Sequence, residues 1–192
     1  MIHPRLTVAL GLVVLGLTGC SAIGNAAGQP APVTTTAQQA RTKAEALVDA
    51  TVAQVRPAMD WQASTVTATP NYTGIDGHYD GTALVSLARY APVQVARDRL
   101  PTLEAAITRF WKDKGFRVQV SHSSGGNTFW ADGYGSQIHL QAHSEGNDGV
   151  TVSADVGNFK GPANIQDLDS LFGGSVGGSA PPKPTGDPYW SH

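Results

Sequence analysis

Residues 138–156 read IHLQAHSEGNDGVTVSADV and contain the clearest structural pattern in the chain. Apolar and polar residues alternate on both sides of a turn-forming run at 145–149. Strict alternation is typical of a strand with one buried face, and two such segments around an Asp-Gly turn predict a β-hairpin. Because each strand has one apolar face and one polar face, the sheet should be covered on one side only.

Two amphipathic helices and further strands surround this hairpin. Apolar residues recur at steps of three and four over 37–55 and again over 95–114, which predicts two helices. Pro101 lies inside the second run and predicts either a helix start there or a kink. Shorter alternating segments predict strands at 61–68, 82–90, 116–121 and 128–131. The order predicts an α+β fold, an antiparallel sheet of about five to six strands with two amphipathic helices packed on one face.

Composition excludes several classes of function. The chain has 192 residues, a net charge of −2 and one Cys. At about 150 residues per domain this length indicates a single folded unit, and the small net charge removes the main driving force for nucleic-acid binding. One Cys permits neither an intramolecular disulfide nor a Cys-rich zinc site. We expect no nucleic-acid partner and no cofactor.

The first residues predict an export signal. Residues 1–18 read MIHPRLTVALGLVVLGLT, a basic start followed by an apolar run that is too short to span a membrane comfortably. Leu17-Thr18-Gly19-Cys20 resembles the lipobox of bacterial lipoproteins. The resemblance implies that 1–19 is a removed signal peptide and that Cys20 carries diacylglycerol and palmitate. The alternatives are an ordinary leader that leaves a free thiol, or an uncleaved anchor helix.

The layout of the mature chain follows from composition. We expect the lipidated Cys and a flexible tether over 20–39, an α+β globular domain over 40–160, and a Gly/Pro-rich disordered tail over 161–192. Within that tail, the near-helical spacing of Ile165, Leu168, Leu171 and Phe172 predicts one or two turns that dock on the domain. Two acyl chains hold a protein stably on a bilayer, so the predicted location is the extracytoplasmic face of the cell membrane.

A wider resemblance supports this location. The run Val55-Arg56-Pro57 after a helix, the following Trp61, and the helix-to-strand junction at 107–118 resemble small exported lipoproteins of actinobacteria. That group is largely without assigned activity. The resemblance therefore implies a location and a fold.

Four aromatic residues are the candidate contacts for a ligand or partner. Tyr72, Tyr79, Trp130 and Tyr134 fall in or beside Gly-rich turns, where aromatic rings stack on sugars or peptides, or else close the edge of a small core. The stretch 89–117 carries seven Lys or Arg against three acids. It is interpreted as a solvated face, or as a patch that contacts anionic lipid or wall polymer.

No catalytic residue and no metal ligand is assigned. His139 and His143 share a face of the predicted strand, but at about 3.3 Å per residue they lie about 13 Å apart, too far to hold one ion. Residues 173–177 fit the pattern G-x-S-x-G, yet no predicted strand precedes them. We therefore expect a non-enzymatic binding or interaction module at the cell envelope, with an envelope protein or a cell-wall polymer as partner. The alternatives are a carrier that holds an apolar or sugar ligand between helices and sheet, and an envelope hydrolase.

Overall fold

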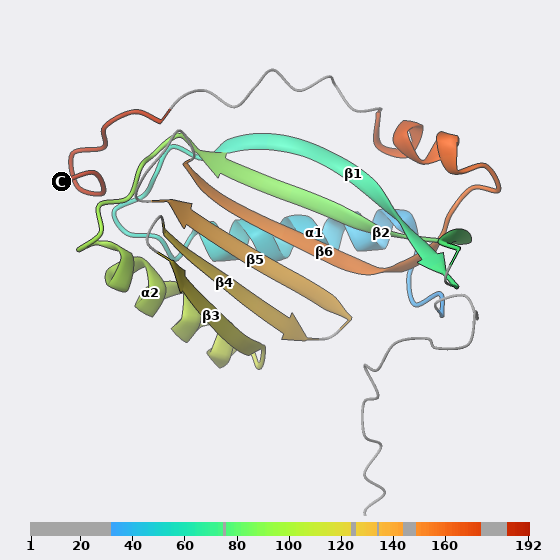
Figure 1. Ribbon diagram of the computed structural model, residues 1–192, viewed down its shortest axis with the longest axis horizontal. Helices are drawn as coiled ribbons and strands as arrows, with labels where there is room; N and C mark the ends of the chain where they lie inside the picture. The colour runs from blue at the N-terminus through green and yellow to red at the C-terminus, as the bar shows by residue number, and fades with distance from the viewer. Residues whose placement is uncertain (1–31, 75, 124–125, 134, 144–148, 174–183) are drawn as a thin grey trace, which may run out of the picture.

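The computed structural model describes residues 32–74, 76–123, 126–133, 135–143, 149–173 and 184–192. Its elements are α1 (Ala37–Val52), β1 (Gln62–Thr73), β2 (His78–Ala91), α2 (Leu100–Asp113), β3 (Arg117–Ser123), β4 (Gly126–Gly133), β5 (Ser136–His143), β6 (Val150–Lys160) and the 3₁₀ helix η1 (Ile165–Phe172). The six strands form one antiparallel sheet in the order β1-β2-β6-β5-β4-β3 (Figure 1). The predicted α+β fold is confirmed.

Local sequence signals set the ends of both helices. Thr36 caps α1, because its side chain accepts from the backbone N–H of Gln39 at 3.2 Å while the Gln39 side chain accepts from the Thr36 N–H at 3.1 Å. Helix α2 begins at Leu100, with Pro101 in its first turn. Gly115 follows α2 with φ +81°, a conformation that favours glycine.

The helices cover one face of the sheet. Helix α1 packs on β2 and β6, and α2 contacts β3 and β4; Figure 1 shows α1 passing behind the strands. The alternating apolar residues of the predicted hairpin all face this layer and are almost completely buried: Ile138, Leu140, Ala142, Val150, Val152, Ala154 and Val156. The one-sided core that the alternation predicts is therefore present.

A buried hydrogen bond joins the two helices. The indole Nε1 of Trp111 in α2 donates to Thr51 Oγ1 in α1 at 3.0 Å, and both residues are 1% exposed. The same hydroxyl donates to the backbone carbonyl of Leu47 at 2.8 Å. Both polar groups are thus satisfied inside the apolar layer, which fixes α1 against α2.

The C-terminal residues differ from the expected disordered tail. Residues 184–192 lie against the segment between β2 and α2, where the Ala96 N–H donates to the Trp190 carbonyl at 2.6 Å. Trp190 is 1% exposed, and its Nε1 donates to the Pro57 carbonyl at 2.9 Å. Composition correctly marks this segment as rich in Gly and Pro, but one large aromatic side chain supplies enough buried surface to order its end.

Helix α2 begins where Pro101 predicts and not at the start of the apolar run near Val95, and the same contact explains the difference. Val93 forms a parallel β-bridge with Thr185, and Val95 is fully buried. These apolar residues before Leu100 therefore pack where the C-terminal residues dock and are not part of α2. The predicted turns before residue 173 are present as η1, with Leu168 buried and Leu171 exposed. Among the described residues, none of the helices has the length and apolar character needed to cross a membrane.

Thr51→Val removes the hydroxyl that joins the helices and keeps the shape of the side chain. Because the Trp111 N–H then stays buried without an acceptor, we expect a loss of about 1–3 kcal/mol in the free energy of unfolding, measured by urea denaturation. Thr108→Val is the matched control, since Thr108 also donates to a carbonyl four residues earlier but is only half-buried. Equal losses for the two variants would contradict the assignment.

Candidate functional site

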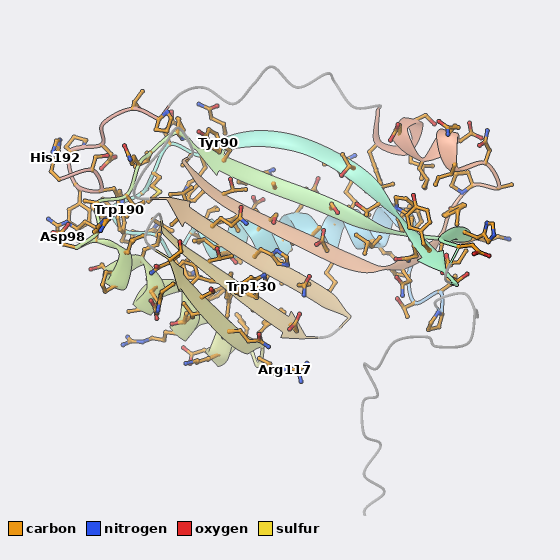
Figure 2. The ribbon with its side chains drawn as sticks, viewed as in Figure 1. Tyr90, Asp98, Arg117, Trp130, Trp190 and His192 are labelled. Atoms are coloured by element: carbon orange, nitrogen blue, oxygen red, sulfur yellow. The ribbon has the colours of Figure 1, made fainter. Side chains whose placement is uncertain are left out.

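The face of the sheet opposite α1 and α2, here called the open face, is polar. It carries the side chains that alternate with the buried ones, and the view in Figure 1 is toward it. Trp130, between the buried Phe129 and Ala131, is the large aromatic residue near its centre (Figure 2). The open face is therefore a broad surface that the one-sided core leaves accessible.

A row of hydrogen-bonded polar side chains crosses the open face. Gln137 Nε2 on β5 donates to Asp132 Oδ1 on β4 at 2.8 Å. Ser86 Oγ on β2 donates to Asp155 Oδ1 on β6 at 2.6 Å, and Thr69 Oγ1 on β1 lies 2.9 Å from the same Ser86 hydroxyl. Strand register places Gln137 beside Asp155, so these five residues form one continuous polar row.

A second row lies next to the polar row, two residues along each central strand. Its members are Gln119, Trp130, His139 and Ser153, which are neighbours in the strand register of β3, β4, β5 and β6. His139 is half-buried, and its Nε2 is inaccessible to solvent without a hydrogen-bond partner among the described residues. This row combines an indole ring with an amide, an imidazole and a hydroxyl.

The open face has a pocket beside the middle of the polar row, where Gln137 and Asp155 line it. It has a volume of about 380 Å³ and is lined by Thr34, Leu84, Gly135, Ser136, Gln137, Asp155, Gly157 and Asn158. We call it the open-face pocket. Its lining contains one carboxylate, amides, hydroxyls, an apolar side chain and no Lys or Arg. The pocket thus combines hydrogen-bond donors and acceptors with a single negative charge.

The two carboxylates of the polar row have neutral partners. Within the described ranges, neither Asp132 nor Asp155 forms an ion pair with Lys or Arg. Both accept hydrogen bonds from neutral side chains, Asp132 from Gln137 and Asp155 from Ser86. Arg117 on β3 is the cross-strand neighbour of Asp132, whereas no Lys or Arg lines the pocket beside Asp155. Asp155 therefore gives the pocket a local negative charge that disfavours anionic ligands.

The four predicted aromatic contacts do not form one cluster. Tyr72 is 56% exposed and pairs across the strands with Tyr79, at the end of the sheet where β1 turns into β2. The Tyr79 hydroxyl is buried against Gly161, and this burial, together with the Asp80 carboxylate, raises the pKa of Tyr79. Trp130 lies on the open face, and Tyr134 lies outside the described residues.

The basic residues of 89–117 are spread over several environments. Arg89 forms an ion pair with Asp49 of α1 at 3.2 Å, and Arg99 stacks over the Tyr189 ring with 4.4 Å from the guanidinium carbon to the centroid. Arg109 and Lys112 are exposed on α2. These side chains therefore do not form one continuous patch on the open face.

The remaining candidate features offer fewer groups for binding or catalysis. A second pocket of about 260 Å³ lies beside the docked C-terminal residues and is lined by Gln94, Ala96, Pro184, Thr185, Gly186 and Ser191. In the part of the chain that the structure describes, no three His, Cys, Asp or Glu residues lie close enough to hold a metal ion. Cys20, and residues 174–177 of the G-x-S-x-G pattern, lie outside that part.

Comparison with known proteins adds no assignment, because the chain matches no family model, no curated protein and no solved structure. The fold itself defines the class: an α+β protein with a two-helix layer on one face of a six-stranded antiparallel sheet.

The sequence pattern missed the polar row. Gln137 and Asp155 are polar positions of the predicted hairpin, and alternation already placed both on the solvent side. What it did not supply is the strand order, which brings Ser86 of β2 beside Asp155 of β6. The sequence indicates which face of the sheet each side chain occupies. It does not indicate which residue lies beside it on the neighbouring strand.

Adjacent residues of β4 test the assignment of the two faces. Phe129 is fully buried in the core, whereas Trp130 is half-buried on the open face. We expect Phe129→Ala to lower the free energy of unfolding by about 3–5 kcal/mol, and Trp130→Ala to lower it by about 1 kcal/mol or less. Guanidinium unfolding of both variants measures the difference, and a larger loss for Trp130→Ala would reverse the assignment.

Proposed function

We propose that this chain is a lipid-anchored extracytoplasmic protein and that its domain is a non-catalytic binding module at the cell envelope. The lipid on Cys20 would hold it to the membrane, and the open face would contact an envelope protein or a cell-wall polymer. The observation that carries the proposal is the open face itself: a broad polar surface with Trp130 near its centre and a pocket at one end.

The packing of the molecule favours binding at the surface over a carrier. The side chains between the helices and the sheet are buried hydrophobics in mutual contact, including Leu87, Leu103, Ile107 and Trp111. The two pockets described above lie elsewhere, one on the open face and one beside the C-terminal residues. A carrier would require space within the apolar layer, so the polar surface is the better candidate for ligand contact.

The arrangement of the polar row also favours binding over hydrolysis. Its carboxylates accept hydrogen bonds from Ser86 and Gln137, and this bonding fixes the side chains in one orientation. A nucleophilic serine needs a general base that is itself oriented by a third group. Ser86 instead bonds to a carboxylate and to Thr69 Oγ1, which is the pattern of a preorganised surface.

Replacement of the anchoring residue tests the location. We expect Cys20→Ser to move the protein from the membrane fraction to the soluble extracytoplasmic fraction, because the thiol that would carry the acyl chains is gone. Immunoblots of fractionated cells measure the distribution. Ser21→Ala, a neighbouring change that keeps the thiol, is the control and should stay with the membrane; an unchanged distribution for Cys20→Ser would reject the anchor.

Site-specific photocrosslinking in cells tests the binding face. Benzoylphenylalanine at Gln119 or Gln141, both exposed on the open face, should capture a specific envelope component. The same probe at Arg109, exposed on α2 in the opposite layer, should capture none of it. Capture of one component in equal amounts from both layers, or from α2 alone, would contradict the open face as the contact surface.

A further inference from the structure

We infer that the open-face pocket binds one unit of a neutral saccharide and that Trp130 stacks on a neighbouring unit of the same chain. The inference rests on the proposed function and names the ligand class of its binding face. It depends on the shape of the pocket, on the hydrogen-bonding groups that line it, and on the position of Trp130 relative to them.

The walls of the pocket are held by backbone contacts. The Thr34 N–H donates to the Asn158 carbonyl at 2.8 Å, and the Asn158 N–H donates to Thr34 Oγ1 at 3.2 Å. The Gly157 N–H donates to the Gly135 carbonyl at 3.0 Å. Gly157 has φ +60°, and a Cβ there would meet the Thr35 side chain at 2.7 Å. The pocket is therefore preformed, and its volume of about 380 Å³ falls within the range of about 300–1,000 Å³ for small-molecule sites.

The polar groups of the pocket match hydroxyls. Asp155 accepts from Ser86 through Oδ1, and its Oδ2 has no partner among the described residues. Gln137 is oriented by its bond to Asp132, which leaves its amide oxygen as an acceptor. Asn158 accepts from Asn71 through Oδ1 at 2.9 Å, which leaves its amide N–H groups as donors. The set offers donors and acceptors together, as a sugar hydroxyl, which is both, requires.

The remaining lining excludes other ligand classes. With Asp155 as its one charged group and no Lys or Arg, the pocket repels phosphates, carboxylates and anionic headgroups. An amine only donates, and would leave the Asn158 amide N–H groups without an acceptor on the ligand. Leu84 supplies an apolar wall for the C–H face of a pyranose ring, a surface that sugars have and small polar ions lack.

Trp130 lies at a distance suited to a second unit. In the strand register Asp132 faces Gln137, and Trp130 is two residues from Asp132 on the same strand. At about 3.3 Å per residue and 4.8 Å between strands, Trp130 lies about 8 Å from the pocket residue Gln137. This separation is larger than one sugar ring and places the indole beside the next unit of a linear oligosaccharide. Aromatic faces stack on the C–H side of such rings.

The test uses the folded domain on a printed array of neutral oligosaccharides, followed by calorimetric titration of the bound ones. We expect binding to at least one array glycan, and a tenfold or greater loss of affinity in both Asp155→Asn and Trp130→Phe. Asp155→Asn keeps the shape of the side chain while it removes the charged acceptor. Asp167→Asn and Phe172→Tyr on η1 are the matched controls and should bind as the parent does.

Each outcome decides the inference. No binding to any array glycan, or binding that Asp155→Asn and Trp130→Phe leave unchanged, would overturn it. Stronger binding of spermidine than of any glycan in the same titration would also overturn it, and would assign the pocket to a polyamine. Because photocrosslinking from Gln119 and Gln141 does not depend on ligand class, capture of a protein there without glycan binding would reject the saccharide and keep the binding face.

Discussion

Burial on one side of a six-stranded sheet is the constraint on which the rest of this structure depends. The side chain of every second residue on β4, β5 and β6 faces the helices, so a shift of one residue in any strand would exchange the two faces. The apolar set therefore fixes the register, and the register in turn fixes which polar groups meet on the open face. Ser86 meets Asp155, and Gln137 meets Asp132, because Leu87, Ala154 and Ile138 are held in the core.

The two helices cover the apolar face through different means. Helix α1 uses small residues, with Ala40 and Ala44 fully buried, so its backbone lies close to β2 and β6. Helix α2 uses Leu103, Ile107 and Trp111, which reach across to β3 and β4. The Trp111 indole then meets Thr51, and one buried hydrogen bond sets the separation of the helices. Trp190 closes the end of this layer against Pro57 and Ala96.

Periodicity in the sequence determines which face of a helix or strand each residue occupies, but not which distant segments pack together. Helix and strand periods located both helices and all six strands, because a residue's face depends only on its own neighbours in sequence. Pro101 indicates the start of α2, but periodicity does not predict the docking of residues 184–192, because Val95 and Trp190 lie about ninety residues apart in the sequence. Likewise, the sequence identifies Trp130 as a candidate contact, whereas only the strand order shows that Gln119 and His139 are its neighbours.

The position of the N-terminal segment relates the open-face pocket to the proposed anchor. Thr34 lines the pocket and is fourteen residues after Cys20, so a chain leading from a lipid on Cys20 reaches the sheet at the pocket. Helix α2, with the exposed Arg109 and Lys112, lies at the other side of the sheet (Figure 1). This arrangement favours a solvated role for those basic side chains.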